Sequence, residues 1–179
     1  MLFRSCLRGA NDLHFLFAPL KHARLDYLVQ KTVEMGASRL QPVITRHTQV
    51  ARVNVERMRA NVIEAAQQCG ILNLPEIAEP ASFTAAISEA DAGRLLVFCD
   101  EDAAVQDPVA ALAAHAGASL AVLIGPEGGF AEEERAALLK RPNVARIALG
   151  PRILRADTAA VAALALVQTV LGDWRAGSG

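Results

Sequence analysis

The stretch LIGPEGGFAEEE, residues 123–134, concentrates residue types that could bind a ligand. Its three glycines permit positive φ angles and close approach of a ligand to the backbone, and Pro126 restricts the entry to the turn. The acidic residues that follow fall where a helix should begin and would favour its positive end, which argues against a phosphate site there. The segment has neither the Lys-Ser/Thr of a P-loop nor the spacing of a dinucleotide-binding motif. Taken alone, it is either a tight strand-to-helix turn or part of a ligand site.

A second candidate segment is LGPRILRAD, residues 149–157. Gly150 and Pro151 end an apolar stretch, and Asp157 is placed to cap the helix that follows. Arg155 has two interpretations, because an arginine near a binding loop is either paired within the protein or available for an anionic group.

These segments need elements to position them, and apolar runs of strand length alternate with amphipathic helical patterns along the chain. Asn54 and Gly70 are placed as the N-cap and the terminator of one of the helices. The alternation predicts an α/β fold with a mainly parallel sheet flanked by helices, in which ligands bind beyond the carboxyl ends of the strands. Strands or extended pieces are expected at 13–18, 40–45, 74–79, 94–100, 119–125 and 144–150, and helices at 24–35, 54–70, 83–90, 105–116, 131–140 and 158–171.

Composition excludes several classes of protein. The 179 residues carry a formal net charge of −1 and are 53% hydrophobic, which indicates one globular domain without a strong electrostatic signal for nucleic acid. The three cysteines and four histidines show no metal-ligand spacing, so no metal is expected. The longest apolar run, 159–167, is far too short to span a membrane, and a soluble cytoplasmic protein is predicted.

Taken together, the two motifs and their order resemble the 16S rRNA (uracil-N3)-methyltransferase family, the ribosomal small-subunit methyltransferase E group of the SPOUT superfamily. The upstream segments LVQKTVEMGASRLQPVITRHTQV and EAAQQCG, the latter followed by LPEI, are similar to further family blocks. The resemblance extends from about Asp12 to Trp174. Ile71 departs from the arginine that many members have, and Asp157 stands where glutamate is usual.

The resemblance implies a C-terminal deep trefoil knot, a homodimer and S-adenosylmethionine (SAM) as methyl donor to N3 of a uridine in 16S rRNA, which is expected in the assembled 30S subunit. Arg155 is the implied catalytic residue, stabilising the uridinate or holding the base or phosphate. Glu127 is either a polar clamp or an acceptor for loop N–H groups. The implied cofactor-binding residues are Phe98, Cys99, Gly125, Pro126, Glu127, Gly128, Gly129, Leu149, Gly150, Ile153, Leu154 and Arg155.

Members of the family carry an N-terminal PUA-like barrel that helps to grip RNA. Residues 1–11 are therefore expected to be a remnant or linker of a missing barrel, 12–175 the SPOUT methyltransferase domain, and 176–179 a disordered tail. The basic residues expected to contact RNA are Lys21, Arg24, Arg46 and Arg52, although an ordinary solvated face is the alternative. The rival functions are a SPOUT methyltransferase acting on another RNA and a non-catalytic ligand-binding α/β module.

Overall fold

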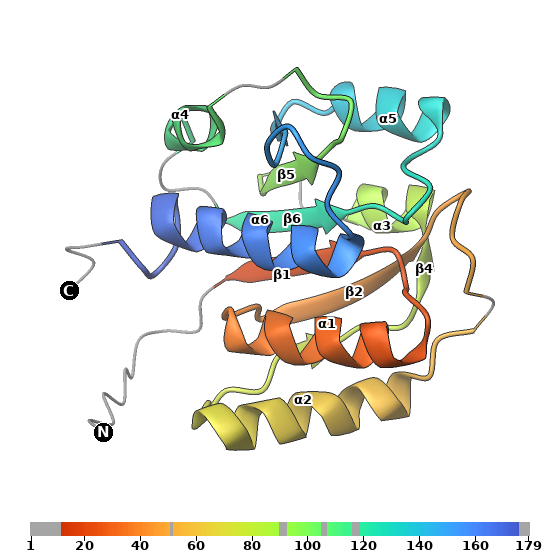
Figure 1. Ribbon diagram of the computed structural model, residues 1–179, viewed down its shortest axis with the longest axis vertical. Coiled ribbons are helices and arrows are strands. Elements are labelled where there is room, and N and C mark those ends of the chain that lie inside the picture. The colour runs from red at the N-terminus through yellow and green to blue at the C-terminus, as the bar shows by residue number, and fades with distance from the viewer. Residues whose placement is uncertain (1–11, 51, 90–92, 105–106, 116–118, 176–179) are drawn as a thin grey trace.

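The computed structural model describes residues 12–50, 52–89, 93–104, 107–115 and 119–175. Within them, strands and helices alternate along the chain as the sequence predicts (Figure 1). The strands are β1 (Leu13–Phe17), β2 (Arg39–Ile44), β3 (Glu76–Ile77), β4 (Ala81–Ser82), β5 (Leu95–Cys99), β6 (Leu120–Ile124) and β7 (Val144–Ile147). The helices are α1 (His22–Glu34), α2 (Val55–Cys69), α3 (Phe83–Glu89), α4 (Pro108–Ala113), α5 (Glu132–Leu139) and α6 (Ala156–Val170).

The described strands form one seven-stranded sheet in the order β3-β2-β1-β6-β5-β7, with β4 also paired to β2. Every pairing is parallel. β1 lies beside β6, so that Phe17 is in register with Ile124. All the strands therefore end at one edge of the sheet, where the loops after β5, β6 and β7 come together.

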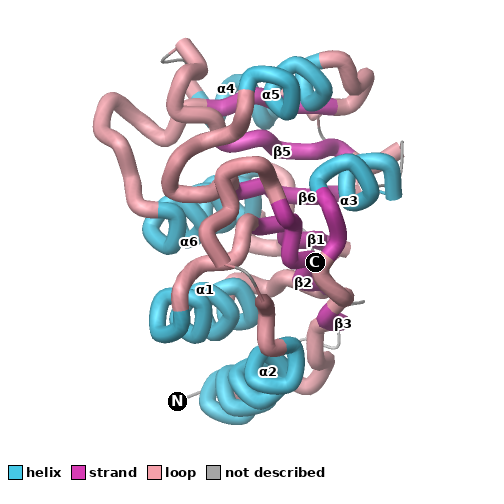
Figure 2. The backbone as a smooth tube through the Cα atoms, turned by 90° about the vertical axis from the view of Figure 1, so that its right-hand side faces the viewer, coloured by secondary structure: helices cyan, strands magenta, loops and turns pink. Residues whose placement is uncertain are grey.

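Helices cover both faces of the sheet. Helices α1 and α6 lie against one face, with α2 packed outside α1, and α3 lies on the opposite face (Figures 1 and 2). Alternate residues of each strand point to opposite faces. As a result, Leu95, Val97 and Cys99 of β5 contribute to one apolar cluster while Leu96 and Phe98 belong to the other.

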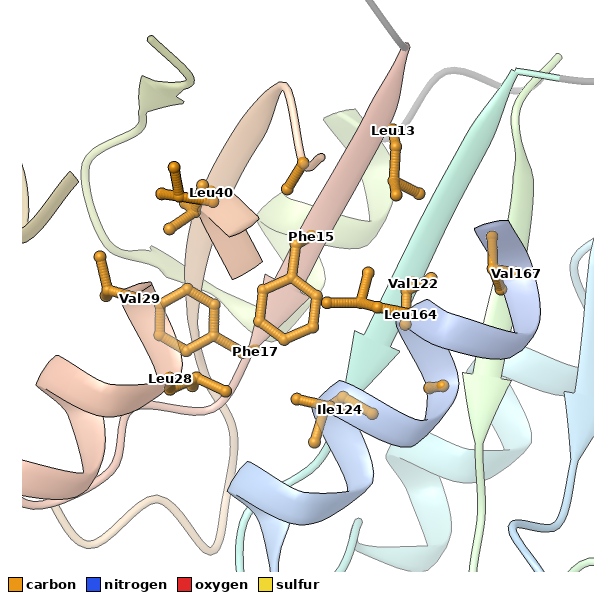
Figure 3. Close-up of a cluster of buried hydrophobic side chains, with 14 of the residues drawn as sticks. Leu13, Phe15, Phe17, Leu28, Val29, Leu40, Val122, Ile124, Leu164 and Val167 are labelled. Carbon is orange, nitrogen blue, oxygen red and sulfur yellow. The ribbon is translucent and has the colours of Figure 1, made fainter. Parts of the chain in front are cut away.

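The larger cluster forms the core between β1, β6, α1 and α6. Phe15 and Phe17 of β1 stack with ring centroids 5.4 Å apart, and side chains of both helices surround them (Figure 3). Buried alanines of α6 allow this helix to pack closely against its neighbours; they are Ala156, Ala160 and Ala163. The aliphatic, aromatic-poor composition is thus sufficient for a continuous core.

The element ends follow local chemistry at several predicted positions. The Asn54 side chain accepts a hydrogen bond from the Arg57 N–H, and Gly70 adopts a φ of 66° at the end of α2, as expected. The cap predicted for Asp157 is wrong: α6 begins earlier, with Arg155 at the N-cap and Asp157 inside the first turn. Asp157 instead accepts a hydrogen bond from the Thr158 N–H at 3.0 Å and from Arg24.

Other boundaries differ modestly from prediction. β7 ends at Ile147 rather than residue 150, because Leu149 and Gly150 turn away into the loop. The short strand β4 is not predicted from the sequence. α4 spans only part of the predicted 105–116 range, of which residues 105, 106 and 116 lie outside the described residues. The predicted N-terminal segment 1–11 and tail 176–179 also lie outside them, and the knot stays a prediction. No helix of the described chain has the length and apolar character needed to cross a bilayer.

Candidate functional site

A cavity of ≈ 290 Å³ opens at the carboxyl ends of β5, β6 and β7, beside the start of α6. It lies where the topology of an open parallel sheet predicts a ligand site. The loops after these three strands and the first turn of α6 line it, and the lining residues are Cys99, Asp100, Glu101, Ile124, Gly125, Pro126, Glu127, Gly129, Phe130, Arg135, Ala148, Leu149, Gly150, Pro151, Arg152, Ile153, Leu154, Arg155, Ala156 and Ala159.

The β6–α5 loop, residues 125–131, is shaped by two glycines that a side chain could not replace freely. A Cβ on Gly125 would lie 2.6 Å from the Phe130 ring. That ring is buried and packs edge-on against Phe98, with centroids 5.2 Å apart. Gly129 has a φ of +69°, and a Cβ there would lie 2.6 Å from Glu101 Oε1. Both glycines thus keep the backbone open toward the cavity.

The start of α5 is fixed by Glu134. Its carboxylate accepts a hydrogen bond from the Ala131 N–H at 3.0 Å and another from the Arg46 N–H at 2.8 Å. The second bond ties α5 to the β2–α2 loop, from which His47 Nδ1 also approaches Gly129 O at 3.1 Å. The predicted acidic helix start is confirmed, and it serves the protein's own N–H groups.

Glu127 pairs with Arg24 of α1 across 103 residues of sequence. The same guanidinium donates to both carboxylate oxygens of Asp157, each at 3.0 Å. The hydrogen bond from Arg24 lowers the pKa of Asp157, and this pairing raises the pKa of Arg24. The Glu127 carboxylate is therefore engaged by Arg24, and no hydrogen bond from a described loop N–H reaches it.

A charged network lies at the β5 side of the cavity. Asp100, 4% exposed, accepts from Arg146 Nε at 2.8 Å and lies 3.3 Å from Arg135 Nε. Arg135 also pairs with Asp102 at 2.8 Å. Two arginines compensate the buried Asp100 carboxylate, so this network is a structural support of the cavity.

The β7–α6 loop, residues 148–155, has few internal constraints. Gly150 has a φ of +94°, a Cβ added there would meet no described atom within 4 Å, and Ile153 is 86% exposed. Arg152 and Arg155 are exposed, and neither pairs with another described residue. This loop therefore presents two cations beside the cavity that have no partner among the described residues. Of the two interpretations of Arg155, its surroundings fit the one in which the guanidinium is available for an anionic group.

Cys99 borders the cavity without the properties of a nucleophile. It is partly exposed at the end of β5, yet burial raises its pKa to about 12. The side chain is therefore a neutral thiol at physiological pH and packs against the core.

Ten of the twelve residues predicted to bind a cofactor line this cavity, and Phe98 and Gly128 do not. The Phe98 side chain is fully buried on the opposite face of the sheet, because it alternates with Cys99 along β5. Gly128 faces outward toward His47. Several lining residues were not predicted, among them Asp100, Glu101 and Arg135; the position of Asp100 directly after a buried strand is the signal that could have indicated it.

The four residues predicted to contact RNA differ in their surroundings. Lys21, Arg46 and Arg52 are exposed, and their side chains have no ion pair with a described residue. Lys21 borders a small cleft shared with His47 and Glu127. Arg24 is different, because two carboxylates occupy its guanidinium.

The chain is thus a parallel α/β domain in which three loops build a ligand cavity at the carboxyl edge of the sheet. The sequence profile of the RNA methyltransferase domain matches residues 8–168, and the chain belongs to this family. The predicted SPOUT methyltransferase fold class is confirmed by solved structures of the same arrangement.

Individual relatives agree with this assignment. The chain is 30% identical over 159 residues to the ribosomal RNA small subunit methyltransferase E of Rickettsia conorii, covering 88% of this chain and 64% of that protein. The structure of the enzyme of that name from Neisseria gonorrhoeae, bound to SAM, has a TM-score of 0.79 at 26% identity and covers 91% of this chain and 68% of its own. The structure of a Legionella pneumophila protein with bound SAM has a TM-score of 0.71 at 30% identity, and the match covers 87% of this chain and 65% of that chain. The chain spans a little under two thirds of the length of the first curated relatives it matches.

Proposed function

We propose that this chain is a SAM-dependent RNA methyltransferase that modifies N3 of a uridine in 16S rRNA. The observation that supports it most is the cavity at the carboxyl edge of the sheet, in a chain of the RNA methyltransferase domain family. The proteins from Neisseria gonorrhoeae and Legionella pneumophila that share this fold carry SAM.

The residues present fit such a cofactor. The cavity volume of ≈ 290 Å³ is near the lower end of the range for small-ligand sites, which begins at about 300 Å³. A side chain at Gly125 would collide with the Phe130 ring, and Gly129 has a φ of +69° that other residues rarely adopt. Glycine at both positions leaves backbone N–H and C=O groups of this loop accessible to an adenine ring. Leu149 and Leu154 supply apolar surface beside them. When bound, SAM would supply an electrophilic methyl group on a sulfonium.

The chain itself must orient the acceptor base and stabilise the charge that develops on it. N3–H of uridine is a weak acid, so the base becomes more anionic as the proton leaves. Arg155 borders the cavity, is exposed and has no partner among the described residues. A cation preorganised at this place would stabilise the uridinate or hold an adjoining phosphate. Because N3 is involved in base pairing within duplex RNA, the target uridine must be unpaired or turned out of its stack.

The proposed partners are 16S rRNA, in the assembled 30S subunit, and a second copy of the chain. Lys21, Arg46 and Arg52 are proposed RNA contacts, since all three are exposed and unpaired within the described residues. The homodimer is what the resemblance of the sequence to the methyltransferase E family implies. The names of the curated relatives support the small-subunit rRNA as the substrate class.

The test has two stages. Calorimetric titration with SAM should show binding at one site per chain, and absence of both heat and thermal stabilisation would refute the methyltransferase proposal. Transfer of a labelled methyl group should then be measured on 30S subunits and on free 16S rRNA, followed by mass spectrometry of the nucleosides. N3-methyluridine is the expected product, whereas another methylated nucleoside would show a different substrate for the same class of enzyme.

A further inference from the structure

Three charged side chains from distant parts of the sequence meet beside the cavity. Arg24 comes from the first turn of α1, Glu127 from the β6–α5 loop and Asp157 from the first turn of α6. Arg24 and Asp157 are separated by 133 residues. Their side chains are 25% and 17% exposed, and Glu127 is 48% exposed. We call these three residues the Arg24 cluster.

Each carboxylate of the Arg24 cluster belongs to a different side of the cavity. Glu127 lines it from the β6–α5 loop. Asp157 lies between Ala156 and Ala159, which line the cavity from α6, and comes two positions after Arg155. Arg24 does not line the cavity, yet it contacts both sides of it.

The geometry uses the shape of the guanidinium as well as its charge. Nε and Nη2 each donate to one oxygen of Asp157 at 3.0 Å, which leaves Nη1 for Glu127. A planar group with a fixed fork of donors can bind two carboxylates in a defined relative position, whereas a lysine ammonium is a point charge without that fork. Removal of the cation would leave Glu127 and Asp157 as like charges close together, and their repulsion would separate the two sides.

We propose that Arg24 is a positioning residue, which sets the distance between the β6–α5 loop and the start of α6 and so the width of the cofactor cavity. The inference rests on the proposed function in taking SAM as the ligand. It also replaces the expectation that Arg24 contacts RNA, because its donors are committed to the protein's own carboxylates.

The test compares Arg24→Met with the matched control Arg57→Met. Arg57 of α2 pairs with Asp26 of α1 at 2.6 Å, so the control also removes an arginine–aspartate pair from α1, but neither partner lines the cavity. Arg24→Met should raise the Kd and the KM for SAM about tenfold or more. Arg57→Met should leave both unchanged. An Arg24→Met protein that binds SAM as tightly as the unaltered protein would overturn the proposal.

Hydrogen–deuterium exchange without cofactor separates this inference from the proposed function. Arg24→Met should increase exchange in residues 125–131 and 150–160 relative to the unaltered protein, whereas Arg57→Met should not. Failure of the unaltered protein to bind SAM would refute the proposed function, while unchanged exchange in these two segments would refute the positioning role.

Arg24→Lys covers the case in which Arg24→Met does not fold. It keeps the charge but loses the fork, so its melting temperature should stay near that of the unaltered protein while its affinity for SAM falls. Full affinity in Arg24→Lys would show that charge alone is sufficient and would contradict the proposed geometry. In a double-mutant cycle, Arg24→Met and Asp157→Asn should be strongly non-additive in their effects on the Kd for SAM, and additive effects would likewise contradict the proposal.

Discussion

The two loops that face each other across the cavity are constrained very differently. The β6–α5 loop is fixed by the packing of Phe130 on Gly125, by the Glu134 carboxylate and by the pair between Glu127 and Arg24. The β7–α6 loop contains exposed Arg152, Ile153 and Arg155, and α6 begins without a side-chain cap. Polar groups that find their hydrogen-bond or ion-pair partners within the protein build a preformed surface. Polar groups without such partners are available to a ligand or to another macromolecule.

This difference predicts that substitutions at the packed, cavity-lining positions of the first loop change stability and cofactor binding together, and that substitutions in the second loop change activity alone.

Arg155→Ala should lower kcat by about 10² to 10³, the range for removing one preorganised electrostatic group. The melting temperature of the variant should not change, because the Arg155 side chain has no ion pair or hydrogen bond with a described residue. Single-turnover methyl transfer and thermal denaturation would measure the two quantities. A large loss of thermal stability would show that the loop is structurally constrained after all. Lys140→Ala, at an exposed position outside the cavity lining, is the control for loss of one positive charge.

Gly125→Val should destabilise the protein by about 2 kcal/mol, since overpacking of a well-packed site typically costs about 1–3 kcal/mol. Any Cβ at this position meets the Phe130 ring at 2.6 Å, and that ring is buried against Phe98. SAM affinity should fall in the same variant, as measured by calorimetry beside urea unfolding. Unaltered stability would mean that the ring moves freely, which would contradict a preformed loop.

Glu134→Ala should reduce the free energy of unfolding by about 1 kcal/mol, the usual scale for losing a helix-capping interaction. The carboxylate bonds to the Ala131 and Arg46 N–H groups would be lost. Glu133→Ala is a suitable control, because it is exposed in the same turn and has no such bonds with described residues. Equal effects of the two substitutions would assign the loss to the helix dipole instead.

The pairing of the Asp157 carboxylate with Arg24 should make the stability of the protein depend slightly on pH in the acid range. The pKa of Asp157 is lowered in the folded protein, chiefly by the hydrogen bond from Arg24, so its stabilisation is fully present above its ordinary pKa of 3.8 and is lost as pH falls through the folded value. Between about pH 7 and pH 3, the drop in melting temperature should be about 2 °C smaller for Asp157→Asn than for the unaltered protein. Asp12 and Asp26, whose pKa values are also lowered, contribute equally to both proteins. An identical drop in the two would indicate that the pairing is energetically neutral.

Gly128→Ala should have the smallest effect, within about 0.5 kcal/mol, as for other exposed surface positions. A Cβ there would lie 3.5 Å from His47 Cβ, which is ordinary contact, and the residue does not line the cavity. Affinity for SAM should be unchanged in titrations run beside Gly125→Val. A large loss would show that the outer side of the loop also takes part in binding.

The sequence predicted the elements well because their signals are local. Asn54 and Gly70 mark the two ends of α2, and the apolar run at 119–125 becomes the fully buried β6. The cap assigned to Asp157 failed because the helix start depends on what the carboxylate binds, and Arg24 binds it from α1.

The cavity was predictable in part for a related reason. Glycines beside strand ends locate the loops, and the family resemblance indicated which loops meet. Side-chain direction was the weak point, although the alternation of Phe98 and Cys99 along β5 shows that both cannot face one cavity. The pairing of Arg24 with Glu127 could not be predicted, since no local pattern links residues 103 positions apart.

The place of β1 in the middle of the sheet also bears on how the protein folds. β1 pairs directly with β6, so residues 13–17 must meet residues 120–124 before the central hydrogen-bond ladder can form. Such long-range parallel pairing is intrinsically slow, because the entropy of closing the intervening chain is lost before the contacts form. During synthesis, Phe15 and Phe17 therefore lack one of their two neighbouring strands until the ribosome has translated β6, and this first strand is the segment that depends longest on protection from aggregation.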